Sequence, residues 1–310
     1  MKLLVVYNTC GIKRDNTEWY IKCINSLLEQ NFDDYRVVVS SCLNSMACFK
    51  TLYQTFKDKI SYCYYGDPYT INITFNKTVQ ECTKYFGGFE GYLYVDSGVL
   101  FNDSNSLKKA YEFFKNGPHA FVTIQVDEDA GYDQWNIKDE SGLILKENLV
   151  VPLGSACNLH SQIFSYEAYR VFNNKLMPDV FRAYCTESTF SFLCAALQKK
   201  WIILKDVVVR HKKGVDGASA SVPHWSPVHK NHWNNLFYGR NAIDFINDPE
   251  AIEAGLGYEE CNKIMMHKKD AFDERYLANE PEKLRKVINK WLFLTKEEFD
   301  YDNMKCNFIP

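Results

Sequence analysis

The stretch Gly-Tyr-Leu-Tyr-Val-Asp-Ser-Gly-Val-Leu-Phe, residues 91–101, is the part of this 310-residue sequence that decides the fold. An apolar run ends at the acidic residue Asp96, and a second short apolar run follows Gly98. A nearly uninterrupted apolar run is typical of a strand buried on both faces of a parallel or mixed sheet. Ligands of open α/β sheets bind at the carboxyl ends of the strands. Asp96 is therefore a candidate ligand-binding residue, although Asp and Gly are also ordinary turn residues.

Strands and helices alternate three times before this stretch. Apolar runs predict strands over 2–8, 35–40 and 60–65, and apolar residues at helical spacing predict helices over 17–28, 46–56 and 76–86. This alternation is typical of a doubly wound α/β domain, with a central sheet flanked by helices. No Gly-x-Gly-x-x-Gly or P-loop motif follows the first strand, which argues against dehydrogenases and P-loop kinases.

The pattern continues beyond the central stretch and changes near residue 217. Further strands are predicted over 120–126, 159–164 and 201–209, and a helix opens at Thr186. After residue 217 the sequence contains prolines, clustered His and Trp, and polar helical segments. We therefore predict a main domain over 1–216 and a mainly helical C-terminal extension over 217–310 that packs on it.

Composition excludes several classes of protein. A net charge of -3 leaves no basic field for non-specific binding to nucleic acid. No apolar run is long enough to cross a bilayer, and the first residues lack a signal-peptide pattern. The 11 cysteines include no Cys-x-x-Cys pair, so a thiolate zinc site is not predicted. We expect a reduced, cytoplasmic protein without a transmembrane segment.

Three motifs, in order and spacing, resemble those of GT-A nucleotide-sugar glycosyltransferases, in particular the family-two type. Tyr94-Val95-Asp96-Ser97-Gly98 resembles the Asp-x-Asp metal motif, and Thr186-Glu187-Ser188 resembles the acidic motif that houses the catalytic base. Val207-Val208-Val209-Arg210-His211 resembles the strand that ends in a metal-binding histidine. The resemblance covers residues 1–213. It implies a nucleotide-binding half over 1–101 and an acceptor-binding half over 102–216.

The resemblance implies that Asp96 and His211 bind a divalent cation, Mn²⁺ or Mg²⁺. A cation that bridges both phosphates of a nucleoside diphosphate stabilises the charge that builds as the glycosidic bond breaks. Oxygen ligands suit both ions, and imidazole is more acceptable to Mn²⁺. Many members of the family have a second acid where this chain has Gly98. The phosphates would then be the main ligands of the ion. His211 can also be interpreted as a surface histidine in a basic cluster.

Glu187 is the candidate general base. An inverting transfer needs a carboxylate that takes the proton from the acceptor hydroxyl. A Glu in the first turn of a helix also complements the helix dipole, which is the alternative interpretation. Asp179, in the preceding loop, is the second candidate.

The resemblance also implies a nucleotide site along the first strand ends. The third helix is predicted to begin at Asn76, so that its N-terminus would face a diphosphate; Asn76 is alternatively a plain helix cap. The second strand ends in Ser40-Ser41, where related enzymes have an acid, so the choice of uridine as base rests on its frequency alone. The predicted nucleotide-binding residues are Thr9, Asp67, Asn76, Lys77, Asp96, Ser97 and Lys212.

Two aromatic side chains are candidates for the acceptor site. Trp135 is a candidate platform for a sugar ring, although a loop tryptophan often packs beneath its own loop. His160 belongs to the segment that resembles the border of the acceptor site. The His- and Trp-rich segment 224–233 does not have the spacing of a zinc site, and it is predicted to be a lid or a structural element.

The sequence therefore predicts a metal-dependent glycosyltransferase that moves a sugar from a UDP-sugar to a hydroxyl of a glycan, with inversion favoured. Two alternatives remain open at this point. A sugar-phosphate nucleotidyltransferase shares the nucleotide-binding sheet, although the loop after the first strand has little of the expected glycine-rich basic character. A non-catalytic binding module of the same fold is compatible with the glycine at position 98.

Overall fold

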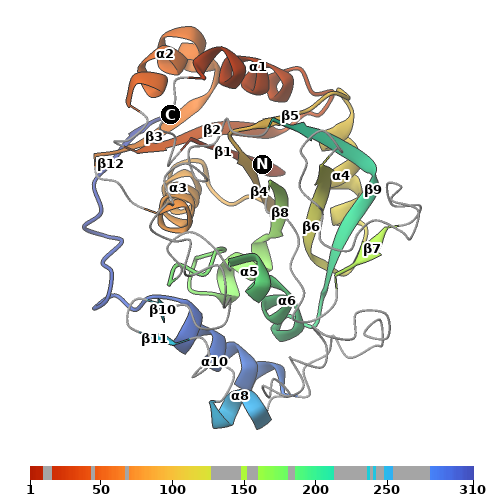
Figure 1. Ribbon diagram of the computed structural model, residues 1–310, viewed down its shortest axis with the longest axis vertical. Coiled ribbons are helices and arrows are strands. Elements are labelled where there is room, and N and C mark those ends of the chain that lie inside the picture. The colour runs from red at the N-terminus through yellow and green to blue at the C-terminus, as the bar shows by residue number, and fades with distance from the viewer. Residues whose placement is uncertain are drawn as a thin grey trace.

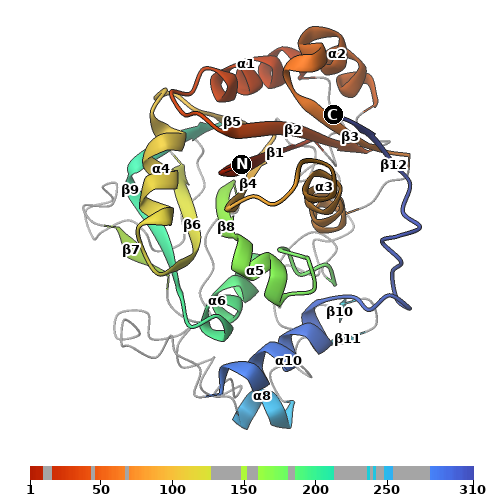
Figure 2. The ribbon, with the colours of Figure 1, turned by 180° about the vertical axis from the view of Figure 1, so that it is seen from behind.

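The computed structural model consists of a mixed β-sheet with helices on both faces (Figure 1 and, from behind, Figure 2). It describes residues 1–9, 16–42, 46–66, 70–126, 148–151, 160–180, 186–212, 236–237, 240–241, 248–253 and 280–310. Within this part of the chain, the main sheet follows the order β12-β3-β2-β1-β4-β8-β6-β9-β5, and β7 also pairs with β9. The small strands β10 (Leu236–Phe237) and β11 (Arg240–Asn241) pair separately.

The first half of the sheet is parallel, as the alternation of strands and helices predicted. Hydrogen bonds join neighbouring strands in the order β3-β2-β1-β4, so that the carboxyl ends of all four strands lie at one edge. These strands are β1 (Leu3–Asn8), β2 (Tyr35–Cys42), β3 (Ser61–Tyr65) and β4 (Gly91–Asp96).

The second half of the sheet changes direction at β4. The next strand, β8, runs antiparallel to β4, and β6 runs antiparallel to β8. Strand β9 is parallel to β6 and pairs with the short strands β5 and β7. The bounds are β5 (Val99–Leu100), β6 (His119–Val126), β7 (Leu149–Val150), β8 (Ser161–Ser165) and β9 (Lys200–His211).

Two hydrophobic clusters cover the two faces of the sheet, and alternating residues of β1 belong to each. Leu4 and Val6 pack with the side of α3, α5, α6 and α10, whereas Leu3 and Val5 pack with the side of α1, α2 and α4. A strand with both faces buried is the arrangement that its continuous apolar sequence predicted. The helices are α1 (Thr17–Leu28), α2 (Met46–Phe56), α3 (Ile71–Phe86), α4 (Ser106–Lys115), α5 (Tyr166–Val171), α6 (Thr186–Ala196), α8 (Pro249–Glu253) and α10 (Pro281–Leu292), with the short 3-10 helix η2 (Lys57–Lys59) after α2.

Helix α3 begins earlier than the sequence predicted. Thr70 is its N-cap, with a side-chain oxygen that accepts a hydrogen bond from the backbone of Ile73. The predicted start at Asn76 is therefore wrong, because Asn76 lies in the second turn of the helix. The apolar pattern is clear only from Val79 onward, because the first turns of the helix are polar. The cap at Thr70 marks the actual start of the helix.

A row of amide side chains along α3 holds the segment that precedes α6. Asn72 donates to the carbonyl of Pro178, and Asn76 donates to the carbonyl of Met177 at the same distance, 2.8 Å. The side-chain oxygen of Asn76 accepts from the backbone N–H groups of Leu176 and Met177. Because Asn76 is fully buried, these hydrogen bonds are protected from water.

The C-terminal segment is joined to the main sheet by a strand that the sequence did not predict. Strand β12 (Cys306–Ile309) pairs antiparallel with β3 at the edge of the sheet. Helix α10 packs against α6, and the side chain of Arg285 donates to the carbonyl of Ala196 at 2.8 Å. None of the described helices has the length and apolar character needed to cross a membrane.

We expect Asn76→Ala to lower the free energy of unfolding by about 2–4 kcal/mol, because it leaves three buried backbone groups without partners. Chemical denaturation measures this loss. Gln80→Ala is the matched control, since Gln80 lies one turn further along α3 and donates to Asn174 at an exposed position. The control should change stability by less than about 0.5 kcal/mol. Equal effects of the two variants would contradict the structural role of Asn76.

Candidate functional site

Asp96 and His160 lie side by side because β4 and β8 are antiparallel. Val95 pairs with Ser161, so the carboxyl end of β4 meets the amino end of β8. The backbone N–H of Asp96 donates to the carbonyl of His160 at 2.8 Å. The strand pairing therefore places a carboxylate and an imidazole at the same edge of the sheet, where ligands of α/β folds bind.

The chain brings His211 to the same place through β5 and β9. His211 is the last residue of β9 and pairs with Val99 of β5, which directly follows the two-residue turn after β4. The backbone N–H of Lys212 donates to the carbonyl of Gly98 at 3.1 Å. This short ladder fixes the end of β9 against the Asp96 turn.

Asp96, His160 and His211 together form a compact group of three side chains, called the Asp96 cluster below. Nδ1 of His160 lies 3.2 Å from Oδ2 of Asp96, and Nε2 of His211 lies 3.8 Å from the same oxygen. The two imidazole rings stack with centroids 4.0 Å apart. One nitrogen or oxygen of each residue lies within 4.8 Å of the other two. The three donor atoms therefore lie close enough together to be candidates for binding one metal ion.

Asp96 and His211 are kept in the forms that bind a cation. Burial raises the pKa of the Asp96 carboxyl, but the hydrogen bond and charge of His160, the charge of His211 and the backbone of Ser97 together hold it below its ordinary value. Burial, assisted by His160 and opposed by Asp96, lowers the pKa of His211 to about 4. At neutral pH His211 is therefore uncharged and has a lone pair available for a metal.

The spacing of these donors fits a divalent cation. Donor atoms at right angles around an ion, with bonds of about 2.1 Å, lie about 3 Å apart; the separation of Asp96 and His160 is 3.2 Å, and that of Asp96 and His211 is 3.8 Å. His160 and His211 are buried, and the Asp96 side chain is 15% exposed. The site is thus partly open to solvent on the Asp96 side, and Asp96 and His211, the two predicted ligands, are the residues that would hold the ion.

Gly98 makes room for the imidazole of His211. A Cβ atom at position 98 would lie 2.7 Å from Nε2 and 2.8 Å from Cδ2 of His211, and 3.1 Å from the backbone oxygen of Lys212. Distances below 3 Å between such atoms require one of them to move. A glycine at position 98 is therefore a condition for His211 to lie where it does.

Trp19 belongs to the same neighbourhood, and the sequence did not single it out. Its indole Nε1 donates to the carbonyl of Gly98 at 3.3 Å. The ammonium of Lys212 lies 4.9 Å from the centre of the Trp19 ring, and that of Lys22 lies 5.5 Å from it. Cation–π attraction therefore holds two lysines near the Asp96 turn. On the other side, the hydroxyl of Tyr7 donates to the carbonyl of Ser97 at 2.5 Å.

Three residues predicted to bind the nucleotide are buried and hydrogen-bonded to other parts of the chain. The Thr9 hydroxyl donates to the Ser40 carbonyl at 3.0 Å and lies 2.5 Å from the Ser41 hydroxyl. The Lys77 ammonium donates to the carbonyl of Tyr301 and pairs with Glu81 on its own helix. Asn76 bonds the segment before α6, as described above. Direct contact of these three residues with a nucleotide stays a prediction.

Asp179, the second candidate for the general base, is fully buried in an ion pair. Its carboxylate lies 2.8 Å from the Lys175 ammonium and accepts hydrogen bonds from the Tyr301 hydroxyl and the Leu294 backbone. Burial raises the pKa of this carboxyl, and Lys175 opposes the shift. These contacts join the C-terminal segment to the segment before α6. A catalytic role of Asp179 stays a prediction.

The remaining predicted site residues lie at the limits of the described structure. Glu187 is in the first turn of α6, as predicted, but its side chain is outside the described part. Asp67, Trp135 and the segment 224–233 lie outside the described residues. Their roles stay predictions.

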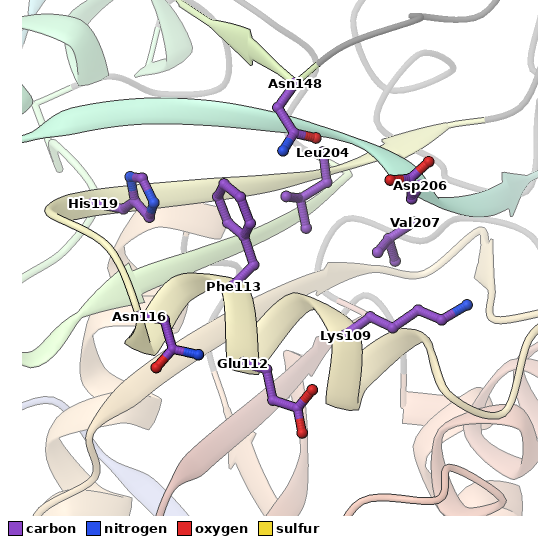
Figure 3. A pocket seen from close by; sticks show the side chains of 9 residues that line it. All are labelled: Lys109, Glu112, Phe113, Asn116, His119, Asn148, Leu204, Asp206 and Val207. Carbon is purple, nitrogen blue, oxygen red and sulfur yellow. The ribbon is translucent and has the colours of Figure 1, made fainter.

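A separate pocket of about 580 Å³ lies between α4 and β9 (Figure 3). Its lining combines charged side chains, including Lys109 and Asp206, with the ring of Phe113, on which His119 stacks. No residue of the Asp96 cluster lines it. We therefore locate the candidate site at the strand ends and not in this pocket.

The sequence matches no protein-family model and no curated protein sequence. The structure nevertheless resembles solved glycosyltransferases. TarS 1–349 of S. aureus in complex with UDP-GlcNAc is 15% identical, with a TM-score of 0.56 over 93% of this chain and 80% of that chain. The mannosyltransferase PcManGT from Pyrobaculum calidifontis, in complex with GDP-Man and Mn²⁺, is also 15% identical, with a TM-score of 0.52 over 94% and 87% of the two chains.

GalNAc-T7, in a structure with UDP, GalNAc and Mn²⁺, is 9% identical, with a TM-score of 0.51 over 94% of this chain and 59% of that chain. At such identities the similarity concerns the fold. This chain therefore has the GT-A fold of these glycosyltransferases, and the predicted fold class is confirmed.

We expect Gly98→Ala to remain folded, to lose about 1–3 kcal/mol of stability and to bind Mn²⁺ more weakly, because the new methyl group displaces His211. Denaturant unfolding and calorimetric titration with Mn²⁺ measure the two effects. Gly88→Ala is the control, since a Cβ atom there meets nothing within 4 Å. Mn²⁺ affinity and stability equal to those of the wild type would refute the close packing of Gly98 and His211.

Proposed function

We propose that this protein is a metal-dependent glycosyltransferase that transfers a sugar from a nucleotide-sugar donor to a hydroxyl group of a glycan. The observation that carries the proposal is the Asp96 cluster, which lies at the carboxyl end of β4 in a GT-A fold. The neighbours in this fold include complexes with UDP-GlcNAc and with GDP-Man and Mn²⁺. UDP is our first choice of nucleotide, and Mn²⁺ our first choice of ion.

The chemistry assigns a separate task to each side chain. A divalent cation, when bound, supplies Lewis-acid stabilisation of the diphosphate leaving group. Asp96 and His211 would hold and orient this ion, and the backbone N–H of Ser97 fixes the Asp96 carboxylate by donating a hydrogen bond of 2.8 Å to it. Lys212, next to the Asp96 turn, supplies a further positive charge for a phosphate.

Glu187 is our candidate for the general base. The acceptor oxygen attacks the anomeric carbon as the bond from that carbon to the diphosphate breaks, and Glu187 takes the hydroxyl proton. Its place in the first turn of α6 supports this role, because the helix dipole favours the ionised carboxylate there. With a single displacement the configuration at the anomeric carbon inverts. Trp135 remains our candidate for contact with the acceptor.

We also propose that the protein acts in the cytoplasm. The cysteines whose state the structure describes are free thiols, as is usual for a reducing compartment. They are Cys23, Cys48, Cys63, Cys82, Cys194 and Cys306.

Calorimetric titration with UDP, GDP and dTDP tests the nucleotide site. We expect one of them, UDP first, to bind tightly only with Mn²⁺, and Asp96→Asn to weaken that binding by about 100-fold because the ion loses its charged protein ligand. Asp103→Asn is the control, since the Asp103 carboxylate is exposed and pairs with Lys109. Binding that does not depend on the metal would contradict the role of Asp96, and no binding of any nucleotide would overturn the transferase proposal.

Glu187→Gln should lower kcat by about 10²–10⁴-fold while nucleotide binding is retained, since the base acts in the transfer step. Glu167→Gln is the matched control, because Glu167 occupies the same position in the first turn of α5 and its loss has the same effect on a helix dipole. Proton NMR of the product gives the linkage. An α-linked product from an α-linked donor would rule out inversion.

A further inference from the structure

The Asp96 cluster contains one charged donor and two imidazoles. The second acid of the Asp-x-Asp pattern is missing from this chain, which leaves Asp96 as the one carboxylate among the described metal-binding groups. His160 and His211, 7% and 1% exposed, lie against it with their rings stacked. A cation bound here would therefore have more nitrogen ligands than a cation bound to an Asp-x-Asp pair.

The packing around position 98 leaves no room for the second acid of the Asp-x-Asp pattern. A side chain at position 98 would begin with a Cβ atom 2.7 Å from Nε2 of His211. His160 comes from a different strand, at the amino end of β8, and its Nδ1 lies 3.2 Å from the carboxylate of Asp96. His160 is thus free of the steric conflict that excludes an acid at position 98.

We propose that His160 is the third protein ligand of the ion and that it makes the site selective for Mn²⁺ and related transition-metal ions over Mg²⁺. The proposal deepens the proposed function and rests on its metal site. Mg²⁺ is bound by oxygen ligands and retains several waters, whereas imidazole suits the first-row transition metals. Exchanging a carboxylate for an imidazole therefore weakens Mg²⁺ more than Mn²⁺.

The same exchange changes the charge of the loaded site. One carboxylate and two neutral imidazoles leave a divalent ion with a net charge of about +1, whereas two carboxylates would neutralise it. The remaining positive charge attracts a diphosphate. Binding of the ion and of the nucleotide should therefore strengthen each other.

Electron spin-echo spectroscopy of Mn²⁺ bound to the wild-type protein, with histidine labelled with ¹⁵N, counts the coordinated imidazoles directly. We expect two nitrogens, both with and without UDP. This measurement needs no variant, so it tests the proposal even if substitutions at position 160 prevent folding. One nitrogen, or none, would overturn it, because His160 would then only hydrogen-bond to Asp96.

Variants at position 160 test the selectivity. His160→Gln should weaken Mn²⁺ binding about tenfold or more, and His160→Asp should narrow the ratio of Mn²⁺ to Mg²⁺ affinity by about tenfold, since a carboxylate favours Mg²⁺. Calorimetry and competition between the two ions measure both effects. His119→Gln is the matched control, because His119 stacks on Phe113 in the separate pocket. An unchanged ion preference in His160→Asp would contradict the proposal.

The outcomes separate this inference from the proposed function. Two coordinated imidazoles without any binding of UDP, GDP or dTDP would support the role of His160 and remove support for the transferase. Mn²⁺-dependent UDP binding with only one coordinated imidazole would support the proposed transferase and overturn the role of His160 as a ligand. Failure to bind Mn²⁺ in the presence and absence of nucleotide would overturn both.

Discussion

The candidate site depends on one constraint, the position of β4 between a parallel and an antiparallel neighbour. The parallel partner β1 continues the alternation of the first half, whereas the antiparallel partner β8 turns the amino end of its own strand toward Asp96. Backbone hydrogen bonds join the strands in this register. A shift by one residue would turn every side chain of β4 to the opposite face of the sheet, so the packing on both faces maintains the register. His160 therefore faces Asp96 as a result of strand pairing, and His211 arrives independently through β5 and β9.

Helix α3 and the C-terminal segment support the other side of the proposed reaction centre. The amides of Asn72 and Asn76 hold the segment before α6, and the ion pair of Asp179 and Lys175 binds the same segment to Leu294 and Tyr301. Helix α6, which begins after this segment, is also packed against α10. The polar residues of α3 thus hold the segment that precedes α6, the helix in which the proposed base Glu187 lies.

The sequence allowed the parallel half of the sheet to be predicted because local patterns determine it: continuous apolar runs form buried strands, and helical spacing forms the covering helices. Asp96 and His211, which the structure brings together, are recognisable as candidates because each ends a strand within a motif that resembles those of glycosyltransferases. His160 was placed near the acceptor, since no spacing reveals that β8 pairs antiparallel with β4. The start of α3 was missed because its first turns are polar, and β12 because four residues carry little pattern. Trp19 was recognisable only as an apolar residue of α1, since its hydrogen bond to Gly98 joins distant segments.

Strand β12 has a consequence for the way the protein is made. Its partner β3 is completed early in synthesis, whereas β12 comes from the far end of the sequence. Until then the outer edge of β3 presents unpaired backbone groups, which are a template for pairing with other chains. Until β12 has been made, the nascent chain thus exposes the unpaired edge of β3, and its yield in a cell should depend on chaperones that shield this edge.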